Sequence, residues 1–189
     1  KHLPDPSNIM TNPAPGDIKI QDKNNSGTIT SDDKTIIGNP LPKFQYAINV
    51  NLNYKNFGLN IIGQGVGHVD AYMNGNLIAP FYNTSGPILK SMVTNRWTYE
   101  NPSNKYHRIY SDKGRDALVT SYNIYNAAYF RLKSVQLSYT LDKKLTEKVG
   151  INRLRIFITG ENLLLITNFI EGFDPERKYT NASAAFHPQ

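Results

Sequence analysis

One stretch of strict alternation constrains this chain more than any other feature. From Phe44 to Lys55, Phe, Tyr, Ile, Val, Leu and Tyr occupy the even positions, while Gln, Ala, Asn, Asn, Asn and Lys occupy the odd ones. A period of two predicts a β-strand with one apolar and one polar face. The strand is about twice the usual 5–6 residues and matches the roughly 9–11 residues of a transmembrane β-strand.

The order of residues on the apolar face also indicates a membrane. Aromatic rings stand at its ends (Phe44, Tyr46, Tyr54) and aliphatic side chains fill its middle. A bilayer selects rings at its two water boundaries and aliphatic side chains between them. A soluble β-sandwich would explain one apolar face, but it gives no reason for rings at the ends, so we favour a barrel strand.

Later segments extend this pattern into an all-β antiparallel fold. A second strand follows a tight turn at residues 55–56 and forms a hairpin. A third strand changes phase near Lys133-Ser134, which predicts a β-bulge or a strand that leaves the bilayer and changes neighbours. A short connection, with a helical turn over residues 145–149, leads to a fourth strand at 153–161. The residues between the hairpins are irregular, with one short helix expected between 88 and 99.

The connections alternate between long and short, as in bacterial outer-membrane barrels. The expected organisation is an extracellular loop at 1–43, a hairpin at 44–64, a long extracellular loop at 65–124, a hairpin at 125–161 and another extracellular loop at 162–189. Four strands cannot close a barrel, and open edges are not viable in lipid. We therefore expect a piece of a larger transmembrane barrel.

Composition excludes several other classes of protein. The chain has no cysteine, which removes disulfides and thiolate chemistry. No apolar run is long enough for a membrane-spanning helix. The net charge of +6 is scattered and comes without a nucleic-acid-binding motif, so nucleic acid is not expected as a partner.

Residues 22–33 resemble a calcium-binding loop of the EF-hand type. Oxygen-bearing side chains occupy loop positions 1, 3, 5 and 9, glycine occupies position 6, and a carboxylate occupies position 12. The expected Ca²⁺ or Mg²⁺ ligands are Asp22, Asn24, Ser26, the Thr28 carbonyl and Asp33. Asp replaces the usual bidentate Glu at the last position, so affinity should be low, and a metal-free Gly/Asn/Ser turn is the alternative.

No catalytic constellation appears, so an enzyme is not expected. The four histidines lack zinc-ligand spacing, and no nucleophile-elbow motif is present. Gly63-Gln64-Gly65-Val66-Gly67 fits no phosphate-binding motif, and we expect it to let the strand bend out of the barrel wall. Aromatic residues within 65–124 are expected to pack that loop and not to stack on sugars.

An ordered series of short motifs resembles the late part of SusC/RagA-family TonB-dependent transporters. The motifs are Ile36-Ile37-Gly38-Asn39-Pro40-x-Pro42-x-Phe44, Tyr54-Lys55-Asn56-Phe57, Arg96-Trp97-Thr98-x-Glu100-Asn101-Pro102, Tyr129-x-Arg131-Leu132-Lys133-x-Val135-Gln136-Leu137-x-Tyr139, Gly160-Glu161-Asn162-Leu163-Leu164 and Phe173-Asp174-Pro175-Glu176. The resemblance runs in order from about residue 17 to residue 176. It implies the C-terminal strands of a 22-stranded barrel in the outer membrane of Bacteroidetes-type bacteria.

The same resemblance implies a function. Members of this family import glycans or peptides, with a SusD-like lipoprotein as an external lid and with energy delivered through TonB. The family's plug domain and its last strand would both lie outside this sequence. No substrate-contacting residue is carried over, because these residues vary among members. The alternative is a soluble extracellular β-sandwich binding module with a Ca²⁺-stabilised loop.

Overall fold

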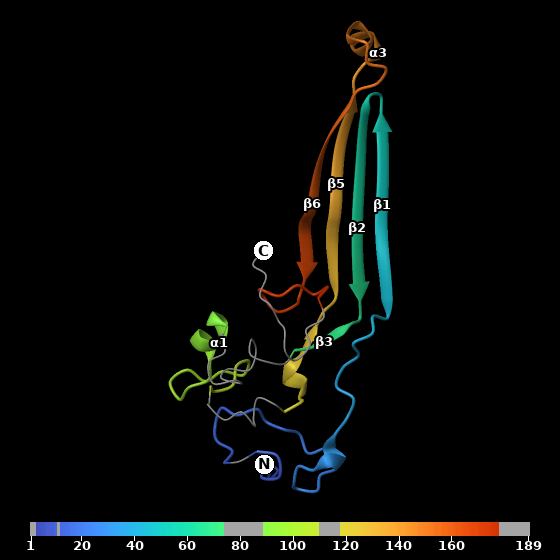
Figure 1. Ribbon diagram of the computed structural model, residues 1–189. Coiled ribbons are helices and arrows are strands. Elements are labelled where there is room, and N and C mark those ends of the chain that lie inside the picture. Colours follow the sequence, from blue (N-terminus) through green and yellow to red (C-terminus); the bar gives the residue numbers. More distant parts are fainter. Residues whose placement is uncertain (1–2, 11, 74–88, 110–117, 178–189) are drawn as a thin grey trace. The chain divides into compact units, whose positions relative to one another are not determined.

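The computed structural model describes residues 3–10, 12–73, 89–109 and 118–177, and it divides them between two compact units (Figure 1). Residues 39–71 and 126–177 form one, which we call the sheet unit. The other, the loop unit, contains the described residues up to 38 and those between 72 and 125.

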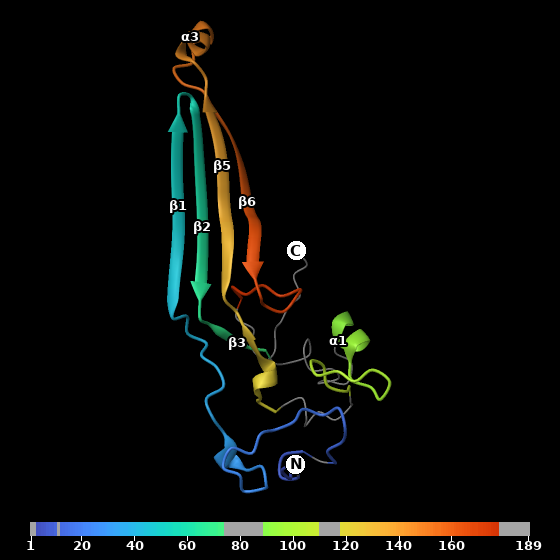
Figure 2. The same ribbon diagram turned by 180° about the vertical axis from the view of Figure 1, so that it is seen from behind.

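The sheet unit is built on one antiparallel sheet of four strands in the order β1-β2-β5-β6. Figures 1 and 2 show these strands side by side in a single layer. Their bounds are Phe44–Tyr54 for β1, Phe57–Gly67 for β2, Tyr129–Thr140 for β5 and Arg155–Thr167 for β6. Within the described part of the chain, β1 and β6 each pair on one side only, so both are edge strands.

Short connections lie at one end of this sheet. Lys55 adopts a left-handed conformation (φ 51°) in the two-residue turn between β1 and β2. Between β5 and β6, the helical turns α3 (Lys143–Thr146) and η3 (Glu147–Val149) end at Gly150 (φ 73°). The two connections meet where Asn56 Nδ2 donates to Asp142 Oδ1 at 2.7 Å. We call this end the turn end, and the opposite end the loop end.

Both hairpins are found, with β1 as expected and β2 and β6 longer than expected. β2 continues to Gly67 and does not end at residue 64. β6 runs from Arg155 to Thr167, so residues 162–167 belong to a strand and not to the expected loop. The segment expected as one strand from 125 is divided, because residues 124–126 form β4 (Ile124–Asn126), which pairs with β3 (Asp70–Tyr72) in a separate two-stranded sheet.

The expected β-bulge lies at Lys133. β5 keeps β2 and β6 as neighbours along its whole length, and the pairing register shifts between Leu132 and Ser134. The phase change is therefore a bulge and not a change of neighbours. On β6 the same irregularity includes Asn162, whose φ is 53°. Because the shift occurs on both sides of β5, apolar residues stay on one face before and after it.

The loop unit contains little regular structure. It holds η1 (Ser31–Asp33), η2 (Ser121–Asn123) and the short helix α1 (Lys90–Asn95), which falls within the helix expected between 88 and 99. Its buried apolar side chains include Met10, Ile29, Met73 and Met92. In the described ranges, no helix combines the length and apolar character needed to cross a bilayer.

Candidate functional site

One face of the four-stranded sheet is apolar along its whole length. The pairing register aligns the even residues of β1 with odd residues of β2 and carries this face across to β6. We call this surface the apolar face. Besides glycines, it consists of Phe44, Tyr46, Ile48, Val50, Leu52, Tyr54, Phe57, Leu59, Ile61, Phe130, Leu132, Val135, Leu137, Tyr139, Ile156, Ile158, Leu164 and Ile166.

Many of these side chains are exposed. Ile158 is 72% exposed, Leu52 56% and Ile48 48%. Contiguous apolar surface of this extent is rare on soluble monomers. An 11-residue strand is about 37 Å long, and at a tilt of about 40° it spans about 29 Å, close to the roughly 25 Å apolar band of an outer-membrane barrel. The face therefore has the extent and composition of a lipid-facing barrel wall.

Aromatic rows lie at both ends of the apolar face. Tyr54, Phe57 and Tyr139 form the turn-end row, where the Phe57 and Tyr139 ring centroids are 4.8 Å apart. At the loop end, Tyr46 lies 6.1 Å from Phe44 and is stacked on Phe130 at 6.2 Å. These rows match the two aromatic girdles of a membrane-spanning barrel.

Glycines in β2 make room for the loop-end rings. A Cβ on Gly67 would overlap the Phe44 ring, and one on Gly65 would overlap Tyr46. At Gly63, a Cβ would lie 2.7 Å from Cζ of Phe130. The expectation that Gly63–Gly67 lets the strand bend out of the wall is therefore wrong, because β2 continues through all three glycines and the rings lie over them.

The opposite face, which we call the polar face, carries amides and hydroxyls. Asn51 Nδ2 donates to Asn49 Oδ1 at 3.0 Å, and Asn60 donates to Asn51. At the same level on the next two strands, Gln136 Nε2 donates to Thr159 Oγ1 at 3.0 Å. Side chains of this kind are suited to a water-filled interior, where they need no buried partners.

An ionic cluster occupies the loop end of the polar face. Arg131, whose side chain is only 9% exposed, lies 2.6 Å from Asp174 and 2.9 Å from Glu176. Glu176 also binds Lys133 Nζ at 2.6 Å. Two cations are thus matched by two carboxylates that follow β6 in the sequence. These ion pairs were not predicted from the sequence, although all four residues lie in motifs noted for the family resemblance.

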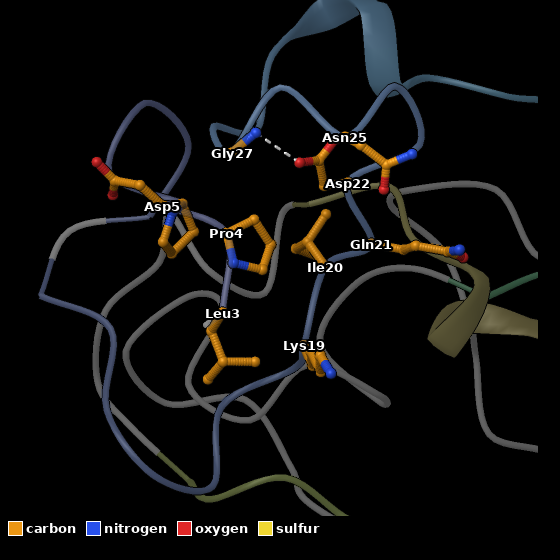
Figure 3. Close-up of a pocket in the computed structure, with 10 residues that line it drawn as sticks. Leu3, Pro4, Asp5, Lys19, Ile20, Gln21, Asp22, Asn25 and Gly27 are labelled. Atoms are coloured by element: carbon orange, nitrogen blue, oxygen red, sulfur yellow. Dashed lines mark hydrogen bonds between the residues drawn. The ribbon is translucent and has the colours of Figure 1, made fainter. Parts of the chain in front are cut away.

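The expected metal loop folds around backbone hydrogen bonds. Asp22 Oδ2 accepts from the Gly27 N–H at 2.7 Å (Figure 3). Asp33 accepts from the N–H groups of Thr30 and Lys23, both at 2.8 Å, and these bonds lower the pKa of its carboxyl. Gly27 has φ +86°, as the sharp turn at loop position 6 requires.

The other expected ligands lie on the same turn. Asn24 Oδ1 accepts from the Ser26 N–H at 2.9 Å, and Ser26 Oγ donates to the Thr28 carbonyl at 2.9 Å. Over the described ranges, no group of three or more His, Cys, Asp or Glu side chains is arranged to hold a metal. The donor set therefore fits only a weakly held hard cation that replaces some of these hydrogen bonds.

An open pocket of about 1030 Å³ adjoins the metal loop within the loop unit (Figure 3). Residues 3–6 form one wall, and residues 19–22 with Asn25 and Gly27 form the other. Asp5 joins the walls, because its N–H donates to the Gly27 carbonyl at 2.8 Å and its carbonyl accepts from Ile29 N–H at 2.9 Å. The pocket was not expected from the sequence.

Comparisons with known proteins agree with this architecture. No family model matches the chain. Among curated proteins, TonB-dependent receptor P3 of Formosa agariphila is 31% identical over 169 residues, which are 88% of this chain and 16% of the relative. TonB-dependent receptor P26 of the same organism is 30% identical over 85% of this chain and 16% of the relative. The chain thus spans about one sixth of the length of these relatives.

Solved structures show the same fold. The RagAB peptide importer in its open-open state matches 80% of this chain and 16% of the solved chain, with a TM-score of 0.59 and 23% identity. The structure of the RagAB peptide transporter matches the same shares with a TM-score of 0.61 and 23% identity. The relatives are receptors and not enzymes, in agreement with the sequence analysis. The chain therefore belongs to the TonB-dependent receptors, and its fold matches a segment of the RagAB importer.

Proposed function

We propose that this chain forms part of the barrel wall of an outer-membrane importer that takes up nutrients in a TonB-dependent manner. The observation that carries the proposal is the apolar face, which is exposed, long enough to cross the apolar band of a bilayer, and flanked by aromatic rows at both ends. In this arrangement the apolar face touches lipid and the polar face lines the lumen.

The proposed partners follow from the relatives. One solved neighbour is named a peptide importer, and the curated relatives are named for their dependence on TonB. We propose that the whole receptor imports glycans or peptides and works with a SusD-like surface lipoprotein. The amide-rich part of the polar face suits either ligand class, because amides both donate and accept hydrogen bonds.

The alternative of a soluble β-sandwich has less support. A sandwich would cover the apolar face with a second sheet. In the part of the chain that the structure describes, the only other sheet is the short β3–β4 pair, and the large apolar side chains of β1 and β6 are exposed.

Site-directed spin labelling of the full receptor in lipid vesicles tests the proposal. Single cysteines at residues 48 to 51 of β1 would be labelled with a nitroxide, and access to oxygen and to a water-soluble nickel reagent would be compared. We expect labels at Ile48 and Val50 to favour oxygen, and labels at Asn49 and Asn51 to favour the nickel reagent. Equal access at all four positions, or the opposite alternation, would reject the barrel wall.

We also propose that Asp22, Asn24, Ser26, the Thr28 carbonyl and Asp33 bind Ca²⁺ or Mg²⁺ weakly. The loop spacing and the left-handed Gly27 support this assignment. Calorimetric titration of the full receptor with each ion would test it, with Asp33→Asn as the variant and Asp32→Asn as the matched control. Absence of heat and of stabilisation at millimolar concentrations would refute metal binding.

A further inference from the structure

The segment that follows β6 turns back onto the sheet and does not extend away from it. Figure 1 shows this orange-red segment beside the loop end of β5 and β6. It is tied down at its start, because Thr167 Oγ1 donates to the Ala128 carbonyl at 2.8 Å and accepts from the Phe169 N–H at 3.1 Å. The chain then turns at Gly172, where φ is 85°. We call residues 168–177 the strap.

The second half of the strap is fixed to the polar face of β5. Glu176 binds two side chains of that strand, Arg131 and the bulge residue Lys133. Asp174 binds Arg131 at 2.6 Å and also accepts from the Glu176 N–H at 3.0 Å. The strap therefore lies across the polar face and not along the apolar one.

Burial of side chains from both the strap and β5 stabilises this attachment. The side chain of Arg131 is 9% exposed, and the strap residues Phe169 and Phe173 are 8% and 7% exposed. A buried guanidinium without a carboxylate is strongly unfavourable, so the carboxylates of Asp174 and Glu176 favour the docked strap. The two carboxylates also balance the charges of Arg131 and Lys133, which leaves this part of the lumen wall electrically neutral.

We propose that the strap is an ion-paired constriction that narrows the loop-end opening of the barrel lumen. The inference rests on the proposed function, which makes the polar face the lumen wall. The Arg131–Asp174–Glu176–Lys133 cluster holds the strap in place, so these four residues set how large a solute reaches the wall below it. They act as positioning residues and need not touch the ligand.

Two measurements on the full receptor test the strap. The test variant is Asp174→Asn with Glu176→Gln, which removes both charges and keeps the side-chain size. Glu171→Gln is the matched control, because Glu171 is an exposed carboxylate of the same strap. Loss of the charges that compensate Arg131 should lower the ratio of docked to undocked strap by about a hundredfold. Hydrogen exchange in residues 168–177 should accelerate in the test variant and stay unchanged in the control.

Access to the lumen wall is the second measurement. A cysteine at Gln64, whose backbone pairs with that of Arg131, would be exposed to a small maleimide and to a polyethylene-glycol maleimide applied from outside. With the strap docked, we expect the small reagent to react and the large one to react slowly. The test variant should speed the large reagent by at least tenfold and leave the small one unchanged.

Each outcome decides one part of the proposal. Unchanged hydrogen exchange in the test variant would refute the ion-paired strap. Faster exchange with an unchanged polyethylene-glycol maleimide rate would refute the constriction. If the small maleimide also fails to reach residue 64 from outside, the polar face is not the lumen wall, and the proposed function fails independently of the exchange result. The single variant Glu176→Gln keeps Asp174 on Arg131 and should show a smaller acceleration, which guards against misfolding of the double variant.

Discussion

The depth of each side chain in the membrane gives the sharpest prediction for β1. The strand runs from residue 44 to residue 54, so its centre is Asn49. At about 3.4 Å per residue and a tilt of about 40°, Ile48 lies about 3 Å from the midplane and Tyr54 about 13 Å from it. Half of the roughly 25 Å apolar band is about 12.5 Å, so Tyr54 lies at the interface.

Arginine substitutions should therefore have very different costs. Ile48→Arg should destabilise the folded barrel by about 2–4 kcal/mol, and Tyr54→Arg by about 0–1 kcal/mol, because the cost of a cation on the lipid face falls toward the interface. Asn49→Arg, on the polar face, is the matched control at the same depth and should cost less than about 1 kcal/mol. Urea unfolding of the full receptor in phospholipid vesicles, followed by the heat-dependent shift of the folded band in electrophoresis, would measure the three values.

This series also separates lipid from a protein core. In a protein core the cost of arginine follows burial, and Ile48 and Tyr54 differ only modestly in exposure, at 48% and 71%. If Ile48→Arg and Tyr54→Arg differ by less than about 1 kcal/mol, the dependence on membrane depth is absent. If Asn49→Arg costs as much as Ile48→Arg, the two faces are not distinct. Either result would refute the lipid-facing assignment.

Three further predictions concern packing and charge. Gly65→Val should displace the Tyr46 ring and cost about 1–3 kcal/mol, which would appear as a lower temperature for loss of the folded band, whereas an unchanged temperature would contradict the overlap. Arg108→Met should cost the loop unit about 3 kcal/mol, because it removes the ion pair to the Asp17 carboxylate, which is 6% exposed, and limited proteolysis of residues 12–38 should accelerate. Burial lowers the pKa of His107 although the Arg108 carbonyl and Asp17 oppose this effect, so the unfolded chain binds this proton more readily. The contribution of neutral His107 to stability is full above about pH 6.5 and is lost as the pH falls through that value toward the folded pKa. The loop unit should therefore be cleaved faster by protease at about pH 5.5 than at about pH 7.5, and His107→Gln should reduce this difference.

The sequence contained enough information to predict the strands whose side chains alternate without interruption. β1 was predicted because every apolar-face residue in it has a large side chain. The bulge was visible because Leu132 and Val135 fall on opposite parities. Short connections at one end follow directly from two antiparallel hairpins.

Two strand ends were missed for identifiable physical reasons. Glycine carries no side chain, so the alternation becomes invisible after Ile61 although β2 continues to Gly67. In β6 the run Leu163-Leu164-Leu165 conceals the face of each residue, because three successive leucines follow the irregularity at Asn162 and show no alternation. The strap was not predictable, since it joins residues that are 43 positions apart in the sequence.

The two aromatic rows are built in different ways. At the turn end, Phe57 and Tyr139 pack ring against ring at 4.8 Å, and β1, β2 and β5 end there or within one residue. At the loop end, rings lie over glycines of β2, so a girdle forms without large side chains on that strand. Backbone pairing does not depend on side-chain size, so β2 keeps its hydrogen bonds to β1 and β5 beneath the rings and continues to Gly67. The glycines therefore allow the sheet to continue to Gly67 at the end where β5 meets the strap, and this continuous sheet gives the ionic cluster a paired strand on which to form.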